Sequence, residues 1–456
     1  MISRIRRLLD RAVQTQFIKD ASVLTGAQLL VTLLAFVQGV VVASWLGPAN
    51  YGIALLIISI PSMMFGILDA RTSAAAVKYL SEFKAEGSPA RALAMCKLAY
   101  SLDFGIAAVV FLAVAAVAPW AQTRVVHSEG TAGLIVLFAA AYLPRALTGS
   151  SQSILTVSGN YRSMAIAQLV AKVVGLVSVL VLVWAGWGVR GVIFGRMAEI
   201  TTLGVSLGVL AAGSARKAWG GSWLGSSFDS LAGRRREIFR FLGYTELTEL
   251  AQVVTKQADV VILGYFGGPT EAGYYGLARR LTGFAGTIVE PLQSVLFPRL
   301  ARYWAETDFG GLSRTLRRFV FGISLPLAGA IFLAIFIVGP FIHYVVGSEF
   351  DPAAPVSRIV FGSTACWVAT CWVRPLFHAM GEVRFLFGYA LVLNLASLAG
   401  FLLLAESDGA AGIGWVHLVL GGIVGPLVSV RFAFHRLNRA RSAPAPAKAS
   451  DATPPR

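Results

Sequence analysis

Long apolar stretches alternate with short polar segments over most of the chain. The apolar stretches are about 20 residues long, enough to cross a hydrocarbon core of roughly 30 Å as α-helices. They show no sustained alternation of apolar and polar residues, which argues against a β-barrel. The pattern predicts an all-α polytopic membrane protein with twelve spans, at 22–46, 52–72, 98–119, 132–151, 164–185, 190–212, 241–266, 274–297, 319–345, 356–379, 385–405 and 411–431.

Two short glycine motifs each occur twice, 221 residues apart, close to half the chain length. The first contains a Gly-Pro pair, and the members of both motifs are Gly47, Gly52, Gly188 and Gly191, which return as Gly268, Gly273, Gly409 and Gly412. Six spans per half is an even number, so the two halves share one orientation and form a parallel internal repeat. Repeats of this kind place a substrate pathway between the halves, near the middle of the bilayer.

Charge is sparse and unevenly placed. Hydrophobic residues make up 56% of the chain and charged residues 14%, with a formal net charge of +16. The basic residues fall into alternate loops, which the positive-inside rule assigns to the cytoplasm together with both termini. This placement argues against nucleic acid as a partner and for membrane lipids.

The expected organisation has five segments. A basic amphipathic cytoplasmic segment precedes the first span, a basic Gly/Ser-rich cytoplasmic linker joins two six-helix lobes, and a tail rich in Pro, Ala and polar residues should be disordered and cytoplasmic. In order along the chain, these segments are 1–21, 22–212 (first lobe), 213–240 (linker), 241–431 (second lobe) and 432–456.

Several kinds of chemistry lack their sequence signatures. The three cysteines have no zinc-ligand spacing, the five histidines are scattered without a metal-binding motif, and no nucleotide-binding Walker motif is present. No nucleophile, base and orienting group occur together. The sequence therefore predicts a protein that is not an enzyme and that uses no metal or cofactor.

The first predicted span and the turn after it read GAQLLVTLLAFVQGVVVASWLGPANYGI. This stretch resembles polysaccharide-biosynthesis flippases, in which the first span ends in an LGP…YG turn. The start of their second lobe is similar to KQADVVILGYFGGPTEAGYYGLARRL, followed by LFPRLARYW. The turns after spans 4 and 10, SGNYR and MGEVR, also fit. The resemblance runs from about residue 20 to 432.

These flippases belong to the multidrug/oligosaccharidyl-lipid/polysaccharide exporter superfamily. The resemblance implies a bacterial inner-membrane protein whose two lobes enclose a V-shaped cavity. It also implies that undecaprenyl-pyrophosphate-linked oligosaccharide moves between leaflets by alternating access, for assembly of surface polysaccharide, lipopolysaccharide or exopolysaccharide. A polysaccharide polymerase and export machinery are then expected partners.

A cavity for a pyrophosphate needs positive charge inside the membrane. A charge at the bilayer centre costs roughly 3 kcal/mol or more, so each intramembrane one needs a reason. Arginine suits a pyrophosphate because its planar group donates two hydrogen bonds to neighbouring oxygens. The predicted substrate-binding residues are basic and come from both lobes: Arg145, Lys172, Lys256, Arg279, Arg280 and Arg374.

Some intramembrane charges have an alternative interpretation. Arg196 lies three residues before Glu199, and Lys256 three before Asp259, so each pair could simply neutralise itself. Glu290 and Asp259 are the candidates for coupling transport to an ion gradient, because a carboxylate in a low-dielectric cavity can load and release a proton. The coupling ion is left open.

Two other functions remain as alternatives. A cation-coupled multidrug or metabolite antiporter of the same superfamily would be expected to have an acidic cavity, whereas the candidates here are mostly basic. A membrane polysaccharide polymerase would be expected to carry a large extracytoplasmic loop or an acidic catalytic pair. The short predicted outer loops favour the flippase.

Overall fold

The computed structural model describes residues 2–68 and 72–442, and the side chains of 25–68, 72–243, 257–440 and 442. This part of the chain consists of helices and short turns, without strands. The helices are α1 (Ile2–Leu68), α2 (Thr72–Ala85), α3 (Pro89–Ala121), α4 (Thr131–Ala140), α5 (Tyr142–Val157), α6 (Tyr161–Leu182), α7 (Gly188–Trp219), α8 (Arg235–Thr282), α9 (Phe284–Ala305), α10 (Phe309–Phe319), α11 (Leu325–Phe341), α12 (Ala353–Ala369), α13 (Val373–Met380), α14 (Val383–Val416) and α15 (Gly425–Ser442).

These helices make twelve passes through the described part of the molecule. Spans 1 and 2 are the two arms of α1, and α2 extends span 2. Spans 3 to 6 are α3, α4 with α5, α6, and α7; spans 7 and 8 are the arms of α8, and α9 extends span 8. Spans 9 and 10 are α10 with α11 and α12 with α13, and spans 11 and 12 are the arms of α14, with α15 extending span 12. The prediction of an all-α polytopic membrane protein is confirmed. By length and apolarity, seven helical stretches of the described residues could cross a membrane, and three of these contain two passes joined at a glycine kink.

The repeated glycines adopt the same backbone conformation in both halves. Gly47 has φ 71° and ψ 169°, and Gly268 has φ 76° and ψ −174°. Gly188 has φ 52° and ψ −128°, and Gly409 has φ 53° and ψ −133°. Such positive φ values are readily adopted only by glycine, so each motif fixes a tight turn between two antiparallel spans. The two six-helix lobes are therefore related by the predicted parallel repeat.

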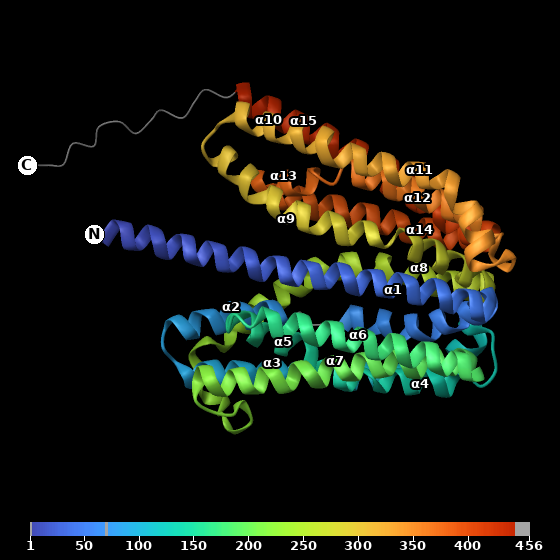
Figure 1. Cartoon of the computed structure of the whole chain (residues 1–456), viewed down its shortest axis with the longest axis horizontal. Helices are drawn as coiled ribbons and strands as arrows, with labels where there is room; N and C mark the ends of the chain where they lie inside the picture. The colour runs from blue at the N-terminus through green and yellow to red at the C-terminus, as the bar shows by residue number, and fades with distance from the viewer. Residues whose placement is uncertain (1, 69–71, 443–456) are drawn as a thin grey trace, which may run out of the picture.

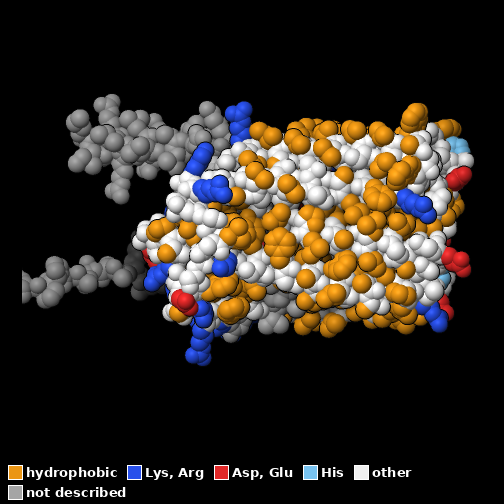
Figure 2. Space-filling view, turned by 90° about the horizontal axis from the view of Figure 1, so that it is seen from below, with side chains coloured by type: hydrophobic (Ala, Val, Ile, Leu, Met, Phe, Trp, Pro, Cys, Tyr) orange, Lys and Arg blue, Asp and Glu red, His pale blue; other side chains and the backbone are white. Residues whose placement is uncertain are grey.

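Figure 1 shows how the lobes are arranged. α2 to α7 lie on the side of the first lobe and α9 to α15 on the side of the second, and α1 of the first lobe runs between them beside α8 of the second. The described ends of the chain lie at one end of the molecule, which we call the terminal end; the turns at Gly47 and Gly268 lie at the opposite, distal end. The lobes converge at the distal end and diverge toward the terminal end. Figure 2 shows apolar side chains over the middle, with Lys and Arg gathered mainly at the terminal end.

The lobes touch most closely at a pair of equivalent glycines at the distal end. A Cβ added to Gly52 of span 2 would overlap the carbonyl oxygen of Pro269, and one added to Gly273 of span 8 would overlap that of Pro48. The backbone of each lobe therefore contacts the backbone of the other lobe at two equivalent places. The ring of Phe350 covers this contact, because it packs edge-on against Tyr51 and Tyr274 with centroids 6.2 Å away in each case.

The linker between the lobes packs against the first lobe at the terminal end. The Trp223 ring stacks on Tyr100 of span 3 with centroids 4.5 Å apart, and Lys97 donates a 2.9 Å hydrogen bond to the Ser226 carbonyl. α7 reaches Trp219 and α8 begins at Arg235, so only the segment between them connects the lobes.

An ion-pair cluster centred on Arg234 joins the end of this linker to span 2. Arg234 pairs with Glu82 at 2.7 Å, Glu237 at 3.0 Å and Glu86 at 3.3 Å. Hydrogen bonding to Arg234 holds the pKa of the Glu237 carboxyl below its ordinary value. The ion pair of Glu237 with Arg234 therefore stabilises the fold at a pH above the ordinary glutamate pKa. This contribution is lost as the pH falls through the lowered pKa of Glu237.

The predicted start of the tail is corrected. Residues 432–442 of the expected disordered segment are helical, since α15 continues to Ser442. Phe432 stacks on Phe385 with centroids 3.7 Å apart, and Arg436 pairs with Glu382. Contacts with the turn before span 11 thus extend the last helix, and 443–456 lie outside the described residues.

The glycine contact predicts a specific effect of one added methyl group. Gly52→Ala should destabilise the closed distal end by about 1–3 kcal/mol, because the methyl must displace backbone rather than a flexible side chain. Spin labels at Glu129 and Glu406, exposed on the two lobes, should report a longer distance in this variant. Gly133→Ala is the matched control, because its Cβ would meet nothing within 4 Å. An unchanged distance distribution in Gly52→Ala would contradict the inference that this glycine contact holds the distal ends of the lobes together.

Candidate functional site

A polar chamber lies between the lobes in the terminal half of the molecule. It has a volume of about 500 Å³ and is lined from spans 1, 4, 5 and 8. Most of the lining side chains can form hydrogen bonds: Thr25, Gln28, Gln152, Thr156, Gln168, Thr287, Glu290 and Ser294. Water and polar ligands can therefore be accommodated between these spans.

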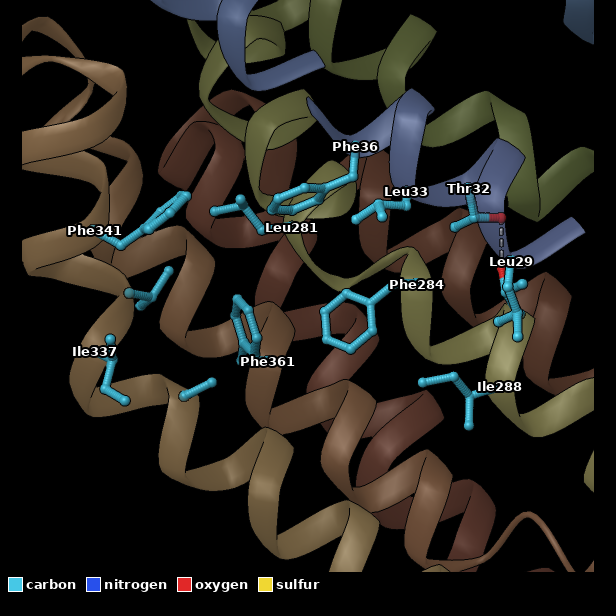
Figure 3. Close-up of a pocket in the computed structure, with 13 residues that line it drawn as sticks. Leu29, Thr32, Leu33, Phe36, Leu281, Phe284, Ile288, Ile337, Phe341 and Phe361 are labelled. Atoms are coloured by element: carbon cyan, nitrogen blue, oxygen red, sulfur yellow. Dashed lines mark hydrogen bonds between the residues drawn. The ribbon is translucent and has the colours of Figure 1, made fainter. Parts of the chain in front are cut away.

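An apolar groove of about 460 Å³ lies on the other side of the contact between spans 1 and 8 (Figure 3). Spans 1, 8, 9 and 10 line it. Leu29, Leu33 and Phe36 come from span 1, opposite Ile337 and Phe341 of span 9, and Phe284 lies between them. Leu33 and Ile337 are more than half exposed, so the groove opens on the outer surface of the helices, where lipid would lie.

A contact between Thr32 of span 1 and Thr287 of span 8 lies between the chamber and the groove. Thr287 lines both, and its hydroxyl lies 3.2 Å from that of Thr32 across the seam between spans 1 and 8. The Thr32 hydroxyl donates to the Gln28 carbonyl at 2.9 Å and can accept from the Thr287 hydroxyl, so both hydroxyls have a partner. Spans 1 and 8 belong to different lobes, and a relative movement of the lobes would break this contact.

Beyond the chamber, five side chains form what we call the central cluster: Gln38, Lys172, Arg196, Glu199 and Arg280. The ammonium of Lys172 lies 2.6 Å from Gln38 Oε1 and 3.2 Å from Glu199 Oε2, and its side chain is only 3% exposed. Arg196 pairs with the other oxygen of Glu199 at 2.7 Å. The interpretation of Arg196 and Glu199 as an ion pair is confirmed, and Glu199 also holds Lys172.

Arg280 brings the second lobe into the central cluster. It donates a hydrogen bond to the Ala35 carbonyl of span 1, and a Cβ on Gly39 would overlap its guanidinium group. Arg280 is close enough to Arg196 and Glu199 to interact electrostatically with both. The cluster thus holds three cationic side chains against one carboxylate, an excess of two positive charges.

The neighbouring Arg279 points into the second lobe instead. Its Nη1 lies 2.9 Å from both carboxylate oxygens of Asp259, which also accepts hydrogen bonds from Tyr275 Oη at 2.7 Å and from the Val260 backbone at 2.8 Å. His417 Nε2 lies 3.4 Å from Asp259 Oδ2. We call Asp259, Tyr275, Arg279 and His417 the Asp259 cluster; it joins spans 7, 8 and 12.

The other predicted residues lie in different surroundings. Arg145 is exposed midway along span 4, over the rings of Phe65 and Tyr142 at 5.4 and 5.5 Å. Arg374 is exposed on α13, in the terminal half of span 10. The predicted substrate set is therefore spread over the interior rather than gathered at one point, and Lys256 lies outside the described side chains.

The two acidic candidates differ as well. Glu290 is exposed and lines the polar chamber, where a proton or ion can reach it. Asp259 is 1% exposed and held by Arg279, a partner 20 residues away on span 8. Since Lys256 is not described, its pairing with Asp259 stays a prediction.

Sequence reasoning missed three participants. Gln38 is a lone amide in an apolar span, Tyr275 lies beside the repeated turn, and His417 lies in no metal-binding motif. The one usable signal was a polar residue in the middle of a span, which is costly unless satisfied. Their partners come from other spans, and spacing along one helix cannot reveal them.

Twelve spans in two parallel lobes define the fold of a membrane transporter. The chain belongs to the polysaccharide biosynthesis protein family, whose profile matches residues 17–304. No curated protein matches the chain in sequence.

Solved transporter structures share the fold. An inward-facing multidrug resistance MATE family transporter of the MOP superfamily superposes with a TM-score of 0.71 at 14% identity, covering 91% of this chain and 96% of that one. The lipid II flippase MurJ, in an inward closed conformation, gives 0.67 at 13% identity, covering 91% and 90%. An outward-facing MATE family transporter gives only 0.56 at 14% identity, covering 93% and 97%.

The contacts of the central cluster predict that substitutions of Glu199 and of Lys172 lower the free energy of unfolding by different amounts. Glu199→Gln should destabilise the protein by about 3–5 kcal/mol, because it leaves Lys172 and Arg196 without a counter-charge. Lys172→Met should cost less, since Glu199 keeps Arg196. Thermal unfolding of both variants in detergent, with the double variant to close a mutant cycle, measures the difference. Equal destabilisation by the two substitutions would show that Glu199 does not hold both cations.

Proposed function

We propose that the protein is a flippase that moves undecaprenyl-pyrophosphate-linked oligosaccharide across the bacterial inner membrane by alternating access, for assembly of surface polysaccharide or exopolysaccharide. The observation that carries this proposal is the positive interior beside a lipid-facing apolar groove. The terminal end would face the cytoplasm, as the concentration of basic residues there favours.

The three parts of such a substrate match three regions of the molecule. The polar chamber offers hydroxyl and amide groups to the glycan. The central cluster, with Arg145, offers positive charge to the pyrophosphate, and the predicted contributions of Lys256, Arg279 and Arg374 remain part of this proposal. The apolar groove offers a surface to the first units of the polyprenyl tail, which can then continue into lipid.

Catalysis of a bond change is not needed for this task. A transporter only has to shelter the anion and the sugar from hydrocarbon while the lobes exchange their open ends. The glycine contact would close the outer side in the state described here, and the Thr32–Thr287 contact would be the place where the lipid tail passes between spans 1 and 8.

Ion coupling is proposed at Glu290 and, as predicted from the sequence, at Asp259. Glu290 is the better placed of the two, because it lines the chamber while Asp259 is already engaged by Arg279. The antiporter alternative fits less well, since a cationic drug would meet three basic side chains in the central cluster. A polymerase and export machinery are proposed as partners on the outer side.

Removing the interior cations should abolish transport without unfolding the protein. Arg145→Ala and Arg280→Ala are each expected to lower flippase activity at least tenfold, because a charge-assisted hydrogen bond contributes about 1.5–3 kcal/mol. The measurement is complementation of a strain of the source organism that lacks its flippase, scored by surface glycan and by inner-leaflet lipid-linked intermediate.

Arg318→Ala, at the terminal end of span 9, is the matched control and should complement fully. If the wild type complements and the two interior variants do as well, the proposed binding residues are wrong. If the well-expressed wild type does not complement, the flippase proposal itself is rejected and the antiporter gains support.

The seam between spans 1 and 8 can be tested by a reversible cross-link. In a background with Cys96, Cys366 and Cys371 replaced by Ala, the variant Thr32→Cys/Thr287→Cys should form a disulfide, because the two hydroxyls now lie 3.2 Å apart. Oxidation should stop transport and reduction should restore it. Each single cysteine variant is the control, and full activity of the oxidised double variant would exclude this seam as the route of the tail.

A further inference from the structure

His417 lies at a place where a proton would have a strong effect. It begins a π-helical segment, His417–Val424, of span 12, and such segments are frequent at functional sites. Its ring lies between Tyr275 and Phe401, with centroids 6.3 and 5.1 Å away. Nε2 is buried and makes no hydrogen bond within the described residues, although Asp259 Oδ2 is only 3.4 Å distant.

Within the described residues, Asp259 is held by one full counter-charge. The carboxylate is almost completely buried, and Arg279 is the cation that holds both of its oxygens. Taking away the partner of a buried charge costs several kcal/mol, so Asp259 cannot lose Arg279 unless another positive charge replaces it.

Arg279 is the member of the Asp259 cluster that an anion can reach. Its side chain is 41% exposed, compared with 1% for Asp259, and it lies on span 8 beside Arg280 of the central cluster. A pyrophosphate bound between the lobes would compete with Asp259 for this guanidinium group. Histidine is the side chain whose ordinary pKa lies near neutrality, so it can supply the replacement charge.

We propose that His417 is a proton-binding site that takes up a proton when a bound pyrophosphate draws Arg279 away from Asp259. The proton comes from water on the side from which the anion enters, is held on Nε2 beside Asp259 Oδ2, and leaves when Arg279 returns. The proton therefore crosses the membrane together with the anion, and the net negative charge transported per substrate is smaller. This inference rests on the proposed anionic substrate; exchange of an ion against the substrate would remain with Glu290.

The surroundings of His417 offer few other groups that could compete for this role. Span 7 contributes Asp259, and span 8 contributes Tyr275 and Arg279. From α14 the ring is faced by Phe401, and from α12 the Ser363 hydroxyl donates to the His417 carbonyl at 2.9 Å. Among the side chains that the structure describes, Asp259 and Arg279 are thus the charged groups whose rearrangement would change proton binding at His417.

The test is the number of protons taken up when farnesyl pyrophosphate binds to the full-length protein in detergent. Calorimetric titrations at pH 7 in two buffers of different ionisation enthalpy give this number. Wild type should take up at least half a proton more per bound anion than His417→Gln. Any change in the protonation of farnesyl pyrophosphate itself contributes equally to both measurements, so the difference reports on the protein. His343→Gln, which removes a histidine paired with Asp351 in the loop between spans 9 and 10, is the matched control and should behave as wild type.

Asp259→Asn serves as a second variant should His417→Gln fold poorly. It should also lose the extra proton uptake, because no buried carboxylate then needs a replacement charge. Equal uptake in wild type and in either variant overturns the proton site while leaving the flippase proposal intact. Failure of farnesyl pyrophosphate to bind to wild type instead counts against the anionic substrate and hence the proposed function.

Discussion

The close approach of Gly52 and Gly273 is the constraint on which the arrangement of the lobes depends. Each glycine faces the carbonyl oxygen of a proline in the opposite motif, so the two turns can meet only where side chains are absent. Two six-helix bodies held together at their distal ends by backbone contact must diverge where larger side chains separate them. The polar chamber, in the terminal half, follows from this geometry.

Low dielectric inside the helices decides how the charges are distributed. Every unpaired charge there would cost several kcal/mol, and the ionic side chains accordingly appear in clusters with shared carboxylates: Glu199 serves Lys172 and Arg196, and Asp259 serves Arg279. The central cluster nevertheless keeps more cations than carboxylates. This excess of positive charge is what the proposed binding of an anionic substrate would use.

Much of the fold could be predicted from the sequence because its signals are local. Apolar length predicts spans, and a glycine at positive φ is needed wherever a turn is that tight, so the repeat of Gly47 at Gly268 was visible without any contact information. Helix ends were less predictable. α15 runs beyond residue 431 because Phe432 stacks on Phe385, a tertiary contact that no local pattern encodes.

The candidate site could be predicted only in part, because its contacts, like the end of α15, depend on tertiary packing. The rarity of charge in apolar spans singled out Lys172, Arg279 and Arg280, and the structure describes an ionic or polar partner for each. Their role in binding a substrate stays a prediction. The identity of their partners depends on which faces of different spans meet. Spacing suggests Lys256 as a partner of Asp259, which stays a prediction. The described partners of Asp259 are Arg279 of span 8 and His417 of span 12, and spacing along span 7 could reveal neither.

Span 8 is the element that links these regions. Successive residues on a helix point about 100° apart, so the adjacent Arg279 and Arg280 face different lobes, one toward Asp259 and the other toward Ala35 of span 1. Farther along the same span, Thr287 closes the seam with span 1 and Glu290 lines the chamber. A rotation of span 8 that moved Arg279 toward a bound anion would also shift Arg280 and Thr287. In the proposed mechanism, anion binding, the contact between the lobes and the route to the lipid are therefore coupled through span 8, formed by the second arm of α8 and by α9.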